Sequence, residues 1–274
     1  MTDPGFVHLH VHSSYSLLEG ALGIARLAEL AKADRQPALA LTDTGNMFGV
    51  LEFSEKMAAA GIQPIVGCAL AVDFEDQEQR PGGTPVEPAR IVLLAASEQG
   101  YRSLMRLNSR AFLDTAPNEP PRIRAGWLDG ETDGLIALTG GPCGPLDAAI
   151  VAGQGSLAAA RCDRLVRYFG ERLYVELQRH GSAAERAAES ALVEVAYARA
   201  IPLVATNEPL FATIEDYEAH DALLCIAEGK LVADPDRRQL TPDHRFKTRA
   251  EMAALFADLP EALASTVEIA QRCT

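Results

Sequence analysis

Histidines stand at alternate positions near the beginning of the chain. Three of the six histidines, His8, His10 and His12, lie within the run Phe6–Ser13, where apolar residues separate them. Residues two apart in a β-strand project from the same face, so this spacing predicts that the three imidazoles converge. Imidazole is a common ligand for zinc, manganese and other divalent cations. The pattern therefore favours a metal site, present or former, over a polar strand face without a ligand role.

Further polar side chains are expected where other strands end. The strand candidates are residues 6–11, 37–42, 64–72, 91–96, 135–138, 173–177 and 202–206. Asp43 follows the second of these runs, Glu176 and His180 close the sixth, and Asn207 with Glu208 follows the seventh. If the strands close in a ring, the loops that follow them face one mouth. These side chains are therefore expected around a shared cleft.

Helix patterns alternate with the strand candidates. They cover residues 24–33, 49–60, 98–113, 156–169 and 183–200. Gly61 stands where a left-handed cap would end the second helix, and Ser182 with Glu185 forms a capping-box pattern before the last. Residues 207–248 begin as a strand exit and are then expected to be irregular. The continuous hydrophobicity of most strands predicts burial on both faces, as in a parallel sheet or an α/β barrel.

Composition limits the classes of protein. The chain has 274 residues, 48% of them hydrophobic, and a net charge of −13, so it can form one large domain or two small ones. It has no apolar run near the roughly 18 residues of a membrane helix and no signal-peptide pattern, so a cytoplasmic location is expected. Its five cysteines include no Cys-x-x-Cys pair, which indicates neither a disulfide framework nor a zinc knuckle. The acidic balance argues against general nucleic-acid binding by this chain alone.

A series of ordered motifs extends over nearly the whole chain. They are Phe6–Ser16, Ala38–Asp43, Ile62–Gly67, Gly100–Leu104, Glu176–Gly181, Ala205–Asn207, Leu223–Ile226, Leu259–Leu263 and Glu268–Cys273. In this order they resemble the polymerase-and-histidinol-phosphatase (PHP) domain at the N-terminus of bacterial DNA polymerase III alpha subunits. The resemblance implies an α/β fold, a distorted seven-stranded (β/α)7 barrel of PHP type, with residues 1–274 as a single domain. Because nothing here resembles a polymerase palm, we expect an excised N-terminal fragment of a longer subunit.

The resemblance also implies a trinuclear metal cluster, which this sequence retains only in part. Four residues stand at ligand positions: His10, His12, Glu19 and Glu208, the last in place of an Asp. Five positions depart from the pattern: Thr44 for a His, Ala69 for a bridging Glu, Arg90 for a His, Gly141 for a Cys (with Cys143 as the alternative), and Leu210 for a His. Alanine, leucine and glycine side chains have no donor, and arginine stays protonated. The expectation is at most one divalent metal, zinc, manganese or magnesium, held weakly.

Other polar residues are assigned supporting roles. The resemblance puts His8 beside the site, as packing or support. Asp43 has two readings: an acceptor that orients a histidine ligand, or a cap for the helix that follows. Glu176 and His180 are expected near the mouth in structural hydrogen bonds. Two histidines with no partner at a telling spacing are expected in solvent: His220 and His244.

Two functions follow from the resemblance. The first is a structural and interaction module of a replicative DNA polymerase III alpha subunit, which docks the proofreading exonuclease subunit and supports the polymerase core. The second is a metal-dependent 3′–5′ exonuclease or phosphoesterase of the PHP class. Because most ligand positions have lost their donor, the first is favoured, and the isolated domain is expected to show no polymerase activity and little or no phosphoesterase activity. DNA is then reached only through the full polymerase, and no membrane partner is expected.

Overall fold

Strands and helices alternate along the computed structural model, which describes residues 5–76, 88–117 and 119–273. The strands are β1 (Ala38–Leu41), β2 (Gln63–Asp73), β3 (Ala89–Ala95), β4 (Ile123–Arg124), β5 (Leu135–Leu138), β6 (Leu173–Gln178) and β7 (Leu203–Thr206). The α-helices are α1 (Ile24–Ala33), α2 (Val50–Ala60), α3 (Glu98–Leu113), α4 (Pro145–Val151), α5 (Gly155–Phe169), α6 (Ala183–Ala198), α7 (Tyr217–Glu228), α8 (Arg249–Leu255) and α9 (Pro260–Arg272). Short 3-10 helices are η1 (Ala125–Leu128), η2 (Gly141–Cys143), η3 (Gly170–Arg172), η4 (Ile214–Asp216) and η5 (Pro242–His244). No helix in the described ranges is long and apolar enough to span a membrane.

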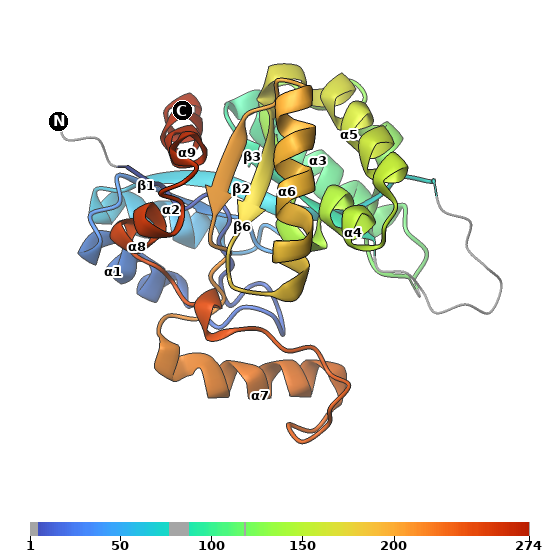
Figure 1. The fold of residues 1–274 in the computed structure, drawn as a ribbon. Helices are drawn as coiled ribbons and strands as arrows, with labels where there is room; N and C mark the ends of the chain where they lie inside the picture. Colours follow the sequence, from blue (N-terminus) through green and yellow to red (C-terminus); the bar gives the residue numbers. More distant parts are fainter. Residues whose placement is uncertain (1–4, 77–87, 118, 274) are drawn as a thin grey trace.

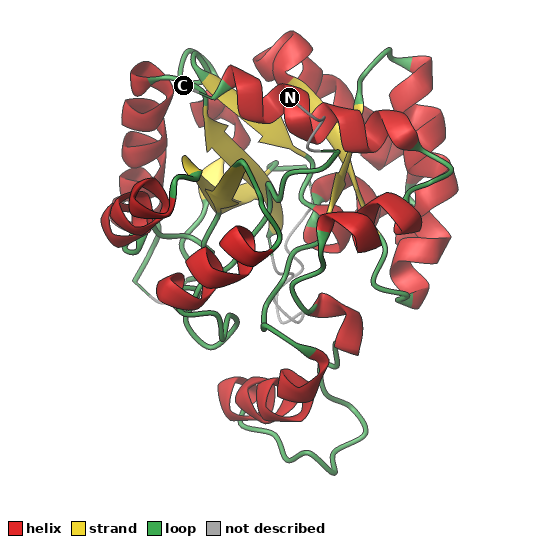
Figure 2. Cartoon of the chain, turned by 90° about the vertical axis from the view of Figure 1, so that its left-hand side faces the viewer, coloured by secondary structure: helices red, strands yellow, loops and turns green. Residues whose placement is uncertain are grey.

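The strands form one curled sheet with helices around it, as Figure 2 shows. The order is β1-β2-β3-β5-β6-β7, and β4 pairs with β2. This confirms the predicted α/β class. Six of the seven predicted strands are present, and the seventh strand of the sheet is β4, which was not predicted. The sheet is not wholly parallel, because β3 runs antiparallel to both β2 and β5. Val92 of β3 lies opposite Leu138 of β5, so the beginning of β3, with Arg90, reaches the edge where β5 ends.

Both faces of the sheet are buried, as the continuous hydrophobicity predicts. The inner face packs Ala69, Val92, Leu94, Ile136 and Leu138 together, and Ile269 of α9 covers them. Alternate residues of the same strands, such as Ile91 and Leu93, pack on the other face in a cluster that α3, α5 and α6 complete. The inner cluster ends at Ala69 and Val92, where polar side chains begin. The site therefore lies at one end of a solid apolar core.

The first predicted strand, residues 6–11, lies along β1 but is not itself a strand. Ala40 N donates to His8 O at 2.9 Å, and Thr42 N donates to Val11 O at 2.8 Å. The stretch from His8 to Val11, three residues on, thus pairs with the stretch from Ala40 to Thr42, two residues on. One extra residue in one of two paired segments is a β-bulge. The chain bends at His10. This bend breaks the regular alternation that the three histidines would need to share a face.

The predicted helix ends are confirmed at two points. Gly61 ends α2 in the left-handed conformation with φ 75°, and Ser182 with Glu185 forms a complete capping box at α6. The prediction that residues 207–248 are irregular was wrong, because α7 lies within them. Figure 1 shows α7 below the sheet, apart from the other helices. An ion pair between Arg237 and Asp221, at 2.5 Å and 2.8 Å, holds the following loop against it.

Candidate metal centre

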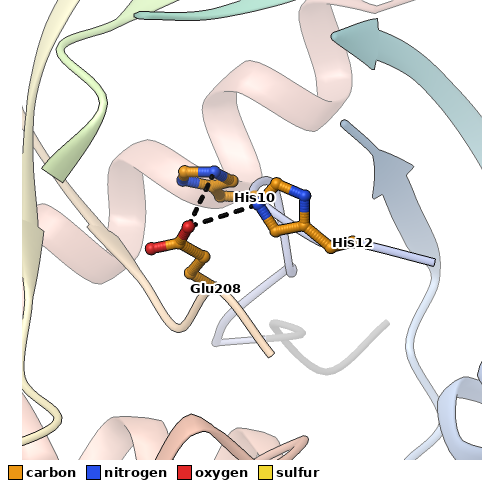
Figure 3. A group of neighbouring side chains, drawn as sticks. All are labelled: His10, His12 and Glu208. Carbon is orange, nitrogen blue, oxygen red and sulfur yellow. Dashed lines mark hydrogen bonds and ion pairs between the residues drawn. The ribbon is translucent and has the colours of Figure 1, made fainter. Parts of the chain in front are cut away.

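Side chains from the first motif and from the loop after β7 meet at the mouth of the curled sheet. His12 Nε2 lies 3.2 Å from Glu208 Oε1, and His10 Nε2 lies 3.7 Å from the same oxygen (Figure 3). One donor atom from each residue lies within 4.8 Å of the others, and no second such group of His, Cys, Asp and Glu donors occurs in the described ranges. Ligands held at about 2.0–2.2 Å from one cation lie about 3–3.5 Å apart. The spacing of these three residues fits one cation.

Two hydrogen bonds orient the imidazoles. Glu176 Oε1 lies 2.7 Å from His10 Nδ1, and Ser16 Oγ lies 2.9 Å from His12 Nδ1. A carboxylate only accepts, so the hydrogen-bond network assigns the His10 proton to Nδ1. Ser16 donates its proton to Asp43 Oδ1 at 2.7 Å, so its oxygen accepts from His12 Nδ1. Both Nε2 atoms face Glu208 Oε1, and His12 Nε2 shares a hydrogen bond with it. A cation would take the place of the proton in that bond and meet the Nε2 lone pairs, as in metal sites whose histidines are held through Nδ1.

The Glu176 carboxylate is fully buried and surrounded by donors. Gly140 N donates to Oε2 at 2.8 Å, Gln178 Nε2 donates to Oε1 at 3.1 Å, and the Thr206 hydroxyl also donates to Oε1. Burial raises the pKa of Glu176, but the charge of His10 and its hydrogen bond outweigh burial and lower that pKa overall. Glu176 is therefore a fixed anion behind His10. The sequence placed it near the mouth in a structural hydrogen bond and missed that its partner is His10.

Opposite charges at the mouth also stabilise one another. Burial lowers the pKa of His10, yet the carboxylates of Glu176 and Glu208 outweigh it and raise the pKa. Burial likewise opposes ionisation of Glu208, but His10 and the hydrogen bond with His12 hold its pKa well below the usual range. Glu208 has a φ of 46°, an uncommon backbone conformation for a residue other than glycine. Such strained positions cluster at functional sites.

The space beside the three donors is small. Its volume is about 10 Å³, roughly what one water molecule or ion occupies. It is lined by His10, His12, Ala69, Arg90, Val92, Gly140, Cys143 and Glu208. Ala69 presents only a methyl group where the resemblance requires a bridging carboxylate, and Leu210 is buried without a donor. The donors that line this cavity are thus His10, His12, Glu208 and the thiol of Cys143, without a bridging carboxylate at position 69.

Glu19, the fourth predicted ligand, is not part of the three-donor group. Its carboxylate accepts two bonds from Arg90, at 2.8 Å and 3.1 Å, and one from Thr44 Oγ1 at 2.6 Å. Burial raises the pKa of Glu19, but Arg90 and Thr44 outweigh it and lower the pKa overall. Arg90 and Thr44 stand at positions predicted to have lost a metal ligand. Both bind Glu19, which was predicted to remain a ligand.

The position of the predicted cysteine ligand is closed. Gly141 has a φ of 57°, and a Cβ built on it would lie 2.6 Å from Gln178 Cδ. Cys143 lines the cavity instead. Burial and the charge of Glu208 raise the pKa of the Cys143 thiol to about 11, which disfavours the thiolate that binds metals. Neither residue supplies a ligand in this arrangement.

His8 and Asp43 lie around the group. His8 packs against Phe246, with ring centroids 4.2 Å apart, and its Nε2 lies 2.8 Å from Lys247 O. It is therefore a packing residue, one of the two roles expected for it. Asp43 accepts from Ser13 N at 2.7 Å and acts on His12 through Ser16. It does not cap α2, whose N-cap has no side-chain bond.

The prediction that His220 and His244 are exposed was wrong. They are 2% and 8% exposed. His220 lies on α7, its ring centroid is 4.9 Å from that of Phe211, and its Nε2 lies 2.6 Å from Glu19 O. His244 stacks on His180 with centroids 3.8 Å apart, and His180 Nδ1 lies 2.7 Å from Glu185 Oε1. His180 Nε2 also bonds Asn207 O, next to Glu208. His180 thus supports the backbone that carries Glu208, as expected for a residue near the mouth.

Comparison with known proteins places this architecture in a family. A model of the PHP domain matches residues 8–180. The chain belongs to the PHP domain family. Over 273 residues, 98% of this PHP chain, it is 46% identical to DNA polymerase III subunit alpha of Caulobacter vibrioides. The subunit from Escherichia coli K12 is 39% identical over 274 residues, 100% of the chain.

The PHP chain spans only 23% of the length of each of these two relatives. Among solved structures it is similar to an amidohydrolase from Chromobacterium violaceum with bound sulfate and no metal. That match has a TM-score of 0.45 and 15% identity, and it covers 74% of this chain and 86% of the other. The family is therefore shown by sequence, and the metal roles of its residues stay predictions.

Proposed function

We propose that this PHP chain is a structural and interaction module of a replicative DNA polymerase III alpha subunit, with a degenerate site for at most one divalent cation. One observation carries the proposal: the cavity gathers three donors, while Arg90 and Ala69 occupy positions where the resemblance has a histidine and a bridging carboxylate. Phosphoester hydrolysis by paired metals needs a second cation a few ångströms from the first. Within the part of the chain that the structure describes, the mouth gathers no second group of His, Cys, Asp and Glu donors.

His10, His12 and Glu208 would hold the cation. Two neutral imidazoles and one carboxylate are a donor set that zinc accepts together with water, and manganese or magnesium would complete its shell with further water. When bound, the metal would supply a positive charge that polarises water or a phosphate oxygen. The residues of the chain orient the donors through Glu176 and Ser16.

The partners follow from the relatives and the family resemblance. They are the remainder of the alpha subunit and the proofreading exonuclease subunit, with DNA reached through the full polymerase. The net charge of −13 supports this, because it repels phosphate from most of the surface. A solid apolar core with a small polar mouth is more typical of a structural domain than of an enzyme with a substrate cleft.

Binding to the exonuclease subunit tests the proposal. The 274-residue chain should bind the exonuclease subunit of its own replisome equally with divalent metal and with chelator, because the surface and not the chemistry is used. It should show no chelator-sensitive turnover of single-stranded DNA or phosphomonoesters. The Glu208→Gln variant is the matched control and should bind the exonuclease like the wild type. No binding by either protein would contradict the proposal.

A metal-dependent 3′–5′ exonuclease or phosphoesterase is the second candidate. The observation that favours it is the carboxylate–imidazole arrangement of Glu176 and His10, since a buried anion behind a histidine is typical of working metal sites. Phosphoester turnover that chelator abolishes and Glu208→Gln removes would establish this candidate. It would also overturn the structural proposal.

A further inference from the structure

A guanidinium group is built into the wall of the candidate metal site. Arg90 lies at the beginning of β3, which the antiparallel course of that strand brings to the mouth. Its Nη2 donates to Glu19 Oε1 at 2.8 Å, and its Nη1 donates to Glu19 Oε2 at 3.1 Å. The two side chains are 25% and 17% exposed. Two parallel bonds of this kind are the strongest geometry available to an arginine and a carboxylate.

The ion pair belongs to the same cavity as the three donors. Arg90 lines that cavity together with His10, His12 and Glu208. Burial lowers the pKa of Arg90, but the charge and hydrogen bonds of Glu19 outweigh burial and raise it, and the charge of Glu208 adds to the effect. The guanidinium is therefore a permanent positive charge within electrostatic reach of both carboxylates.

Assigning each carboxylate to its partners shows what this cation does. Glu176 is occupied by hydrogen bonds from His10 Nδ1, Gly140 N and Gln178 Nε2, and Glu19 is paired with Arg90. The carboxylate left to compensate a metal is that of Glu208. Without Arg90, a second buried carboxylate would need a cation, since an unpaired buried charge is costly. The arginine supplies that charge without any metal.

Building on the proposed one-metal site, we propose that Arg90 is a tethered replacement for a second divalent cation. It removes Glu19 from the ligand set and limits the mouth to one metal ion. The contacts of Thr44 with Glu19 complete this arrangement, because its hydroxyl donates to the oxygen that Arg90 Nη1 also contacts. Arg90, which binds no metal itself, thus determines how many metal ions the mouth can hold.

Manganese stoichiometry, measured by equilibrium dialysis and elemental analysis, tests this role. The wild type and Arg90→Lys, which keeps the positive charge, should take up one equivalent. Arg90→His releases Glu19 and adds an imidazole, so it should take up two equivalents. The double variant Arg90→His with Glu19→Gln should return to one, because the carboxylate is lost again.

Thermal unfolding provides a second measurement that does not depend on counting ions. In Arg90→Met, Glu19 has no counter-charge, so the metal-free protein should have a lower Tm than the wild type. Added Mn²⁺ should raise its Tm by about twice the wild-type shift, since a second binding site adds its own stabilisation. If Arg90→His does not fold without metal, this comparison decides. Arg90→Met combined with Glu19→Gln should lose the extra shift.

Equal stoichiometry and equal Mn²⁺-induced Tm shifts in wild type, Arg90→His and Arg90→Met would overturn the inference. They would make the Arg90–Glu19 pair an ordinary structural ion pair and leave the one-metal proposal intact. Two or three equivalents in the wild type would instead overturn the one-metal site itself. The two failures are therefore distinguishable.

Discussion

At the scale of single residues, the position of one proton on each imidazole decides whether the mouth can bind a metal. Glu176 holds the His10 proton on Nδ1 at 2.7 Å, and Ser16 does the same for His12 at 2.9 Å. Both Nε2 atoms therefore face Glu208 Oε1, where a cation would be bound. A cation site therefore depends on residues that would never touch the cation.

Glu176→Gln tests this dependence. The glutamine amide is neutral, and its NH2 group would face buried groups that now donate hydrogen bonds to Glu176. His10 would therefore lose both the neighbouring anion and its fixed orientation. Metal affinity should fall about 10–100-fold, the usual effect of losing such a supporting carboxylate. Isothermal titration with Zn²⁺ or Mn²⁺ measures it.

Glu189→Gln is the control, because the Glu189 carboxylate is bonded at 2.7 Å and 3.0 Å to Arg179 and not to a histidine of the site. Its metal affinity should equal that of the wild type, although its stability should drop. Equal affinity in Glu176→Gln and wild type would show that Glu176 does not orient His10.

The histidine of η5 makes stability depend on pH. Burial, with a smaller effect of His180, lowers the pKa of His244 from 6.5 to about 3. Its folded pKa lies below its unfolded pKa, so the stabilisation is complete above pH 6.5 and declines as the pH falls toward 3. Between pH 7 and pH 5 the wild type should lose about 1–2 kcal/mol through this group.

Urea unfolding of His244→Gln at the two pH values isolates the effect. The amide cannot take up a proton, so the variant should lose less stability on acidification than the wild type, by about the same 1–2 kcal/mol. An identical pH dependence in both proteins would mean that His244 is charged, or accessible, in the folded state.

The sequence predicted the meeting of His10, His12 and Glu208, because strand exits share an edge of the sheet and family motifs fix the spacing. It did not predict that Glu19 is bound by Arg90. That contact depends on the antiparallel course of β3, which residue types alone did not indicate. The burial of His220 and His244 was missed for a similar reason, since it depends on where α7 packs.

At the scale of elements, the bend before β1 explains why three equally spaced histidines separate. Leu9 packs in the inner cluster, whereas Val11 packs with α1 and α2. Two residues apart, they should share a face in a regular strand. The extra residue of the bulge therefore divides His8 from the donors. The alternation of histidines and apolar residues predicted an extended segment at residues 6–11, but it did not indicate the bulge.

Helix α3 packs against the loop before β5 through a glycine. A Cβ on Gly100 would lie 1.8 Å from Gly134 O, a backbone atom that has little room to move. Gly100→Ala should therefore lower the free energy of unfolding by about 1–3 kcal/mol or more. Chemical denaturation monitored by circular dichroism measures the loss.

Gly155, the first residue of α5, provides the control. Nothing lies within 4 Å of a Cβ built there. Gly155→Ala should raise stability by about 0.5–1 kcal/mol, because alanine loses less backbone entropy than glycine when a helix forms. Similar effects of the two substitutions would mean that the approach of α3 to Gly134 is loose.

At the scale of the whole molecule, the curled sheet brings residues 10, 90, 176 and 208 to one mouth although they are far apart in the sequence. The apolar core and its covering helices are complete without a metal, since the inner cluster ends below the polar residues. The fold therefore does not depend on a metal for its shape. The proposed function, support of other parts of a polymerase, would need only this core.

The number of divalent cations bound by the wild-type chain tests this account most directly. After incubation with Mn²⁺ or Zn²⁺ and gel filtration, elemental analysis should give no more than one equivalent, and His12→Ala should retain none. Two or three tightly held equivalents in the wild type would contradict the account, because they would require ligands beyond His10, His12 and Glu208.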